Sequence, residues 1–197
     1  MNFPLDLRFK TLALAPQVSV TDAGGQLRFY VRQKAFKLRE SITIFADVEQ
    51  TRALYRIDAD RVIDFGARYH IEDAATGAKL GAVRRQGMRS IWRAHYEVER
   101  DGTPVLEVRE ENPWIKLVDG LIGEIPVLGL FSGYLLHPAY RLARAGGGEP
   151  LLRIRKEAAF LEGRYTIERA GPPAGEDDER LAVLGLLMLV LLERSRG

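Results

Sequence analysis

The chain has 197 residues, which suits one domain of ordinary size or two very small ones. Hydrophobic residues make up 46% and charged residues 28%, a composition that excludes a disordered chain. The net charge of +2 excludes a strong global field for nucleic acid, and the lack of cysteine excludes disulfides and thiolate sites. We expect a cytoplasmic protein, peripheral to the membrane at most, that forms a single domain over residues 1–197.

The first 26 residues are hard to place. Apolar residues alternate with polar ones at Phe3, Leu5, Leu7 and Phe9, which predicts one short strand. The run Asp22–Gly25 predicts a turn, because glycine adopts positive φ at low steric cost.

From residue 27 to about 110 the hydrophobic pattern has a period of two. Such a pattern buries one face of a strand and exposes the other, as in an antiparallel sheet. Asp101-Gly102 is a strong hairpin signal. Strand–turn–strand units recur over 42–57, 69–84 and 92–109. Three consecutive hairpins make a meander, and a meander that closes is a barrel.

Residues 113–145 break this pattern and predict an apolar insert of short helices or irregular structure. The candidates for an interaction surface in this insert are Trp114, Leu121, Ile122, Phe131 and Tyr134. A large exposed apolar patch would mark a partner or membrane site. The alternative is that the insert packs over one end of the barrel.

Strands resume near 151–155 and 164–168, and residues 176–196 predict a helix. Acidic residues stand at its start and arginines at its end, which complements the helix dipole. All twelve positions from Leu181 to Leu192 are apolar. They cover only about 18 Å, whereas a spanning helix needs roughly twenty apolar residues. The segment therefore predicts a core helix, with a membrane anchor as the alternative.

A helix that is apolar on every side needs a container that is apolar on every side. A closed antiparallel β-barrel, lined by one face of each strand, provides it. The predicted fold is mainly β, a barrel around a central hydrophobic C-terminal helix. Gly185 lowers helix propensity, and a barrel wall that approaches closely at this point would explain it.

The segment Tyr30–Ile44, followed by Asp47, is similar to strings in LURP-one-related proteins. The likeness continues over Asp64–Asp73 and Val83–Arg85, and the terminal helix matches in position. In total the resemblance covers residues 27–110 and 150–196, and the insert departs from it. It points to the tubby C-terminal-like superfamily, which also includes phospholipid scramblases. The resemblance implies about twelve strands and no enzyme. Members are associated with phosphoinositide binding, with proposed lipid scrambling, or with no known activity.

Catalytic and metal constellations are not evident in the sequence. The histidines His70, His95 and His137 lack a neighbouring ligand at metal-site spacing, and the first two alternate outward on strands. Ser132 lacks the upstream glycine of a nucleophile elbow. We expect no catalytic residue, no metal and no cofactor.

Basic residues cluster in three places and are the candidates for ligand binding. They are Arg28, Arg32, Lys34, Lys37, Arg84, Arg85, Arg93, Arg153 and Arg155. If two clusters met on the barrel wall, they would suit anionic head groups. The alternative is a mixed, solvated surface, because acidic residues are interspersed. Aromatics do not interleave with these bases in an RNA-binding pattern.

The sequence therefore favours a non-enzymatic binding module for anionic phospholipid or a protein partner, and not for nucleic acid. One alternative is a scramblase-like protein anchored through the C-terminal helix. A second is a small-ligand carrier or an enzyme, which the central helix disfavours because it fills the barrel interior.

Overall fold

The computed structural model describes residues 1–10, 17–32, 41–61, 67–85, 95–111, 139–157 and 162–194. These residues form twelve β-strands and one α-helix, α3 (Glu176–Arg194). The strands are β1 (Leu5–Lys10), β2 (Gln17–Thr21), β3 (Leu27–Arg32), β4 (Ser41–Phe45), β5 (Ala53–Ala59), β6 (Arg68–Asp73), β7 (Lys79–Arg85), β8 (His95–Arg100), β9 (Thr103–Glu110), β10 (Ala139–Arg144), β11 (Pro150–Glu157) and β12 (Glu162–Arg169).

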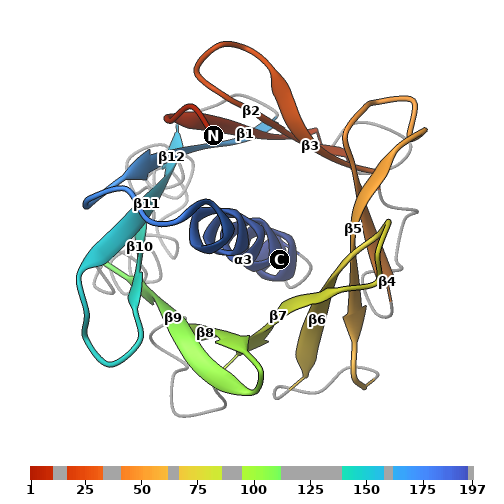
Figure 1. Ribbon diagram of the computed structural model, residues 1–197. Coiled ribbons are helices and arrows are strands. Elements are labelled where there is room, and N and C mark those ends of the chain that lie inside the picture. Colours follow the sequence, from red (N-terminus) through yellow and green to blue (C-terminus); the bar gives the residue numbers. More distant parts are fainter. Residues whose placement is uncertain are drawn as a thin grey trace, which may run out of the picture.

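The strands form one closed antiparallel barrel in chain order (Figure 1). β1 closes it by pairing with β2 on one side and with β12 on the other. The predicted barrel is therefore confirmed. The short strand expected near the start is β1, and β2 is a second strand in the first 26 residues that the sequence pattern did not reveal.

The alternating sequence pattern becomes the two faces of the barrel wall. In β1, Leu5, Leu7 and Phe9 are at most 5% exposed, while the residues between them face outward. In β4, Ile42 and Ile44 point inward in the same way. Inward side chains from all twelve strands thus line the interior.

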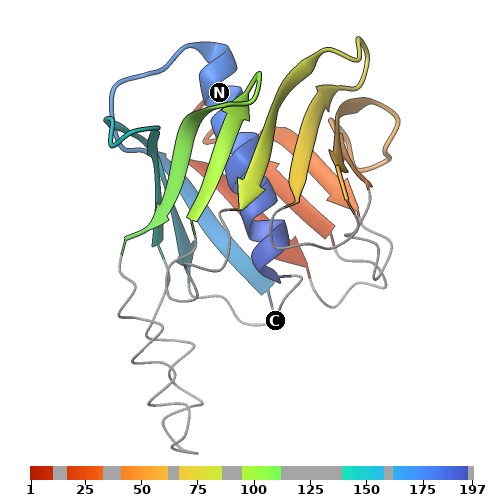
Figure 2. The ribbon, with the colours of Figure 1, turned by 90° about the horizontal axis from the view of Figure 1, so that it is seen from below.

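Helix α3 runs through the barrel and fills it (Figures 1 and 2). Every apolar side chain from Leu181 to Leu192 is at most 6% exposed, and Gly185 among them is buried. The predicted central helix is confirmed, and the anchor alternative fails because the helix is enclosed by the protein's own wall. Within the described residues, none of the helical structure combines the length and the hydropathy that crossing a bilayer requires.

The helix approaches β7 and β8 most closely at glycines. A Cβ atom added at Gly185 would lie 2.9 Å from Cγ2 of Val98. A Cβ atom at Gly81 would meet the carbonyl oxygen of Glu99 and would lie 3.1 Å from Cδ1 of Leu181. The predicted close approach at Gly185 is therefore confirmed.

The two mouths of the barrel differ. The upper mouth in Figure 2 is the end at which α3 begins. It carries the turns over 22–26, 46–52, 74–78, 101–102 and 145–149. The lower mouth is the end at which β1, β3, β5, β7, β9 and β11 finish.

The predicted insert over 113–145 is too long at its C-terminal end. Residues Ala139–Arg144 form β10, which pairs in register with β9 and β11. The alternation in β10 is short, and the apolar residues before it hide its boundary. The five interaction-surface candidates, Trp114, Leu121, Ile122, Phe131 and Tyr134, lie outside the described residues.

Candidate functional site

Three arginines lie in register on the outer wall of the barrel. Arg141 of β10 is directly opposite Arg109 of β9 and directly opposite Arg153 of β11. Neighbouring strands are about 4.8 Å apart, and like charges in directly opposed positions destabilise a sheet. We call Arg109, Arg141 and Arg153 the arginine row. Because the repulsion between these arginines destabilises the sheet, the row is a candidate for a site that binds a ligand.

The carboxylates that accompany the row lie beneath its guanidinium groups. Glu111 accepts hydrogen bonds from Nε and Nη2 of Arg153 at 3.0 and 2.8 Å, and a longer one from Arg141 at 3.4 Å. Glu107 accepts a hydrogen bond from Arg109 at 2.9 Å. The carboxylate side chains are 18% and 10% exposed, whereas the three arginine side chains are 40–61% exposed. The guanidinium groups of the row are therefore more exposed than the two carboxylates bonded to them, while Glu168, directly opposite Arg153 on β12, is 44% exposed.

The row has the chemistry of an anion-binding surface. A guanidinium group offers five N–H donors, and two carboxylates shared among three arginines leave donors directed to solvent. Arginine pairs with phosphate through two parallel hydrogen bonds. Arg155, two residues beyond Arg153 on β11, is exposed but pairs with Glu157 at 3.1 Å and Glu168 at 3.8 Å.

The described members of the predicted basic clusters lie on strands that are not neighbours. Arg28 and Arg32 lie on β3, Arg84 on β7, and Arg153 and Arg155 on β11, and these strands are not neighbours in the barrel. Arg84 instead lies opposite Arg68 and shares Glu99 with it. The remaining candidates, Lys34, Lys37, Arg93 and the side chain of Arg85, lie outside what the structure describes.

Sequence reasoning missed Arg109 and Arg141. Arg109 lies among acidic residues, and Arg141 falls in the predicted insert. The signal that joins them to Arg153 is the register of three strands. This register is set by hairpins far apart in sequence, so local charge counting does not find it.

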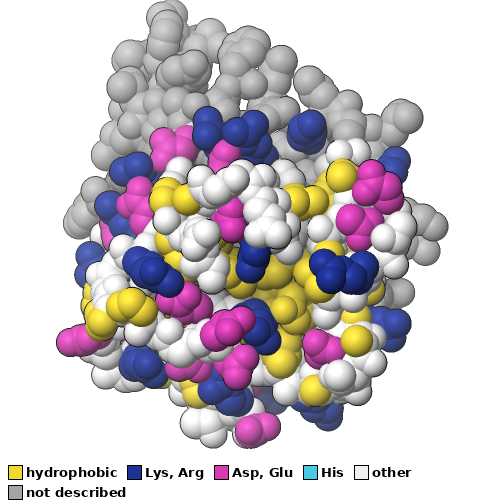
Figure 3. Space-filling model, turned by 45° about the horizontal axis from the view of Figure 1, so that its top comes forward, with side chains coloured by type: hydrophobic (Ala, Val, Ile, Leu, Met, Phe, Trp, Pro, Cys, Tyr) yellow, Lys and Arg dark blue, Asp and Glu magenta, His cyan; other side chains and the backbone are white. Residues whose placement is uncertain are grey.

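A cleft of about 260 Å³ opens at the upper mouth, between β3, β5 and the start of α3. Apolar side chains gather at the centre of this face, with charged ones around them (Figure 3). The cleft is lined by Arg28, Arg52, Arg180, Glu176 and Glu179, over Met1, Leu27 and Leu54.

Arg28 and Arg180 of this cleft already have partners within the protein. Arg180 pairs with Glu176 at 3.0 Å, and Arg28 donates a hydrogen bond to Gln26 at 2.8 Å. Burial is the main cause that raises the pKa of Tyr55, which keeps this phenol neutral at physiological pH. Glu176 and Glu179 add negative charge to the lining, so the cleft is a weaker anion site than the row.

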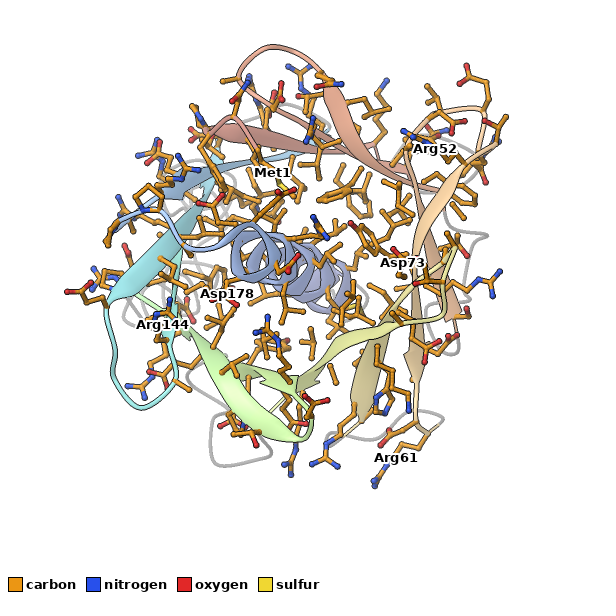
Figure 4. All side chains as sticks on the ribbon, in the orientation of Figure 1. Met1, Arg52, Arg61, Asp73, Arg144 and Asp178 are labelled. Atoms are coloured by element: carbon orange, nitrogen blue, oxygen red, sulfur yellow. The ribbon has the colours of Figure 1, made fainter. Side chains whose placement is uncertain are left out.

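Arginines of the wall hold the first turn of α3. Asp178 pairs with Arg100 at 2.9 Å and with Arg144 at 3.7 Å, and Figure 4 shows Arg144 and Asp178 side by side. Glu179 accepts two hydrogen bonds from Arg169, both at 3.0 Å. Asp178 and Glu179 are thus drawn against the wall, whereas Glu176 and Asp177 are exposed. The cations around this turn position the helix.

The described histidines lie on other strands than the arginine row. In the ranges that the structure covers, no three metal-ligating side chains come together in an arrangement that could hold an ion. His70 is exposed on β6, as predicted. His95 opens β8, and its side chain is outside the description.

Part of the chain matches a known protein family. Residues 27–120 match the model of the LURP-one-related family, which belongs to the tubby-like superfamily. The predicted family resemblance is confirmed. The LURP-one-related region begins with β3 and contains β9, so it includes Arg109 but not Arg141 or Arg153. Together with the barrel, it supports a non-enzymatic binding module in general.

One solved structure is also similar to this chain. It is the X-ray structure of a protein from Arabidopsis thaliana, with 13% sequence identity and a TM-score of 0.49 over 96% of this chain and 91% of that chain. A search of curated proteins gives no match.

Proposed function

We propose that the LURP-one-related barrel binds the head groups of anionic phospholipids through the arginine row. The observation that carries the proposal is the register of Arg109, Arg141 and Arg153 over recessed carboxylates. Opposed like charges are unfavourable in the free protein, and a phosphate placed between them relieves the repulsion.

The row has the dimensions of a surface contact. Two strand spacings place its outer members about 10 Å apart. Each cation near an anionic membrane contributes about 1 kcal/mol. The row therefore contributes less than about 3 kcal/mol, because Glu107 and Glu111 offset part of its charge. Binding of this size is reversible and weakens as salt rises, because the exposed charges are screened.

Vesicle co-sedimentation tests the proposal. The full chain is mixed with vesicles of phosphatidylcholine alone, or of phosphatidylcholine with phosphatidylglycerol. The variant combines Arg109→Gln with Arg141→Gln and leaves Arg153 bonded to Glu111. The glutamine amide at position 109 can still donate a hydrogen bond to Glu107, which otherwise loses its partner at 2.9 Å. The control combines Arg52→Gln with Arg56→Gln, two exposed arginines elsewhere, and removes the same charge.

We expect the wild type and the control to sediment with the anionic vesicles only, and the variant to remain largely in solution. Equal sedimentation of variant and control would remove the row from the binding site. Full inhibition by inorganic phosphate at matched ionic strength would assign the row to a small free anion. A lack of binding to both vesicles would leave a protein partner as the alternative.

A further inference from the structure

Carboxylates are as numerous as arginines around the row. Within the described part of the wall, the row and its neighbour Arg155 pair with Glu107, Glu111, Glu157 and Glu168. A count of charges therefore does not identify where an anion binds. It binds at a guanidinium group whose N–H donors the carboxylates leave free.

Arg141 has more free donors than Arg153, with which it shares Glu111. Its hydrogen bond joins Nε to Oε1 of Glu111 at 3.4 Å, longer than the usual N–H···O range of about 2.7–3.2 Å. In the part of the chain that the structure describes, both Nη groups of Arg141 lack an acceptor. Arg153 instead directs Nε and Nη2 at Oε2 of Glu111, at 3.0 and 2.8 Å.

The surroundings of Arg141 hold few competitors for its free donors. Side chains two residues apart on a strand share a face, and on β10 these neighbours are Ala139 and Ala143. The residues directly opposite Arg141 are the other two arginines of the row, Arg109 and Arg153. An acceptor for the Nη groups therefore has to come from a diagonal position or from a ligand.

Two carboxylates lie within reach of Arg141, and each has a closer partner. Glu107 is diagonal to it on β9 and accepts a hydrogen bond from Arg109 at 2.9 Å. Glu111 accepts its two shorter bonds from Arg153. Without Arg153, the charge of Glu111 would be left to pair with Arg141 alone.

We infer that Arg141 contacts the lipid phosphate, and that Arg153 is a positioning residue that keeps Glu111 from occupying Arg141. The inference rests on the proposed function and assigns separate roles within the row. The phosphate accepts hydrogen bonds from the Nη groups of Arg141. The long bond to Glu111 is lost at small cost, because Glu111 keeps both bonds to Arg153.

A mutant cycle tests these roles. The effect of Arg141→Gln on partition into vesicles of phosphatidylcholine and phosphatidylglycerol is measured in four backgrounds. They are the wild type, Arg153→Met, Arg153→Met with Glu111→Gln, and Arg155→Met. A methionine side chain donates no hydrogen bond, so Arg153→Met frees Glu111 to pair with Arg141. Arg155→Met is the matched control, because it removes an exposed arginine from the same strand that pairs with other carboxylates.

We expect Arg141→Gln to weaken binding about fivefold in the wild type, the effect of one cation near an anionic membrane. In Arg153→Met we expect less than about twofold, the margin within which independent effects agree, because Glu111 already occupies Arg141. Adding Glu111→Gln restores the fivefold effect, and Arg155→Met leaves it unchanged. An arginine that contributes only its charge predicts the same factor in all four backgrounds, and this result would overturn the role of Arg153.

The inference and the proposed function fail separately. If Arg109→Gln with Arg141→Gln weakens binding while Arg141→Gln has the same effect in every background, the assigned roles are wrong and the proposed function stands. If Arg109→Gln with Arg141→Gln does not weaken binding, both are wrong. Thermal melts check folding, and Arg153→Gln replaces an unfolded methionine variant with the same expectation, because a neutral amide holds a carboxylate more weakly than a guanidinium group.

A crystal structure of the folded Arg153 variant tests the same roles without lipid. We expect Glu111 to move onto Arg141 and to accept hydrogen bonds at about 2.7–2.9 Å, the usual length for a charged pair. A distance from Arg141 to Glu111 that stays at 3.4 Å would show that Arg153 does not hold the carboxylate back, and would overturn the inference.

Discussion

Gly185 shows how one missing side chain sets the distance between helix and wall. Glycine in a helix interior is about 1 kcal/mol less favourable than alanine. The structure offsets this loss by packing Val98 against the helix backbone, where a Cβ atom would lie 2.9 Å from the valine methyl group. Close packing of this kind leaves the interior no room for one further carbon.

We predict that Gly185→Ala lowers the free energy of unfolding by about 1–3 kcal/mol despite the better helix propensity, because overpacking forces the wall outward. Urea unfolding followed by circular dichroism measures the change. Gly175→Ala is the matched control, since its added Cβ would have nothing within 4 Å. If Gly185→Ala had the same free energy of unfolding as Gly175→Ala, the barrel wall would be able to move outward at no measurable cost.

Asp73 gives a prediction about pH. Hydrogen bonds from the backbone N–H and hydroxyl of Thr76 lower the pKa of this carboxyl below its usual value of 3.8. A lowered pKa in the folded state gives stability that is complete above pH 3.8 and is lost as the pH falls through the folded-state value. In Asp73→Asn we expect a shallower loss of stability between pH 5 and about pH 2. The urea concentrations at the unfolding midpoints of the wild type and the variant, measured across this pH range, test the prediction. Identical slopes of midpoint against pH would contradict a lowered pKa of Asp73.

Helix α3 is held at its first turn by charges and along its length by apolar contacts. Glu179 accepts two hydrogen bonds from Arg169, whose guanidinium group lies 4.8 Å from the ring centre of Phe3. Arg169 belongs to β12, so the end of β12, Phe3 and the first turn of α3 meet at one point. The closure of the barrel and the docking of the helix are coupled there.

We predict that Glu179→Gln lowers the free energy of unfolding by about 1–3 kcal/mol, the range for a hydrogen bond to a charged group at a largely buried site. Glu176→Gln removes the same charge from a side chain that is 83% exposed, and we expect at most a few tenths of a kcal/mol. Thermal melts of both variants at low salt give the comparison. Equal melting temperatures would show that the pair with Arg169 does not stabilise the helix.

At the scale of elements, the sequence predicts what its local patterns encode. Period-two alternation and the Asp101-Gly102 turn predicted the central hairpins, and the apolar run from Leu181 predicted the enclosed helix. The period-two pattern did not predict β2 or β10, because short strands beside Gly- or Leu-rich segments have too few alternating positions. The arginine row could not be predicted, since it depends on register between β9, β10 and β11.

On the scale of the whole molecule, the barrel and the helix form one core. Twelve consecutive buried helix residues contact the inner face of the wall. Fully burying one large apolar side chain contributes about 1.5–3 kcal/mol, whereas a domain is stable by only about 5–15 kcal/mol. The helix thus contributes more than the whole net stability of the fold.

We predict that a chain ending at Gly175 does not fold. Far-ultraviolet circular dichroism should show the loss of β structure, and thermal scans should show no cooperative transition. The full chain, prepared in the same buffer without detergent, is the control. A truncated chain that melts cooperatively would show that the wall is stable without the helix.

The salt dependence of membrane binding tests the central claim most directly. The full chain is titrated with vesicles of phosphatidylcholine and phosphatidylglycerol at increasing ionic strength, and the partition coefficient is measured at each step. The account predicts tight binding at low salt that weakens steadily as salt rises, and a smaller slope for Arg109→Gln with Arg141→Gln. Binding that is independent of salt, or equal on phosphatidylcholine alone, would contradict recognition of anionic lipid by the arginine row.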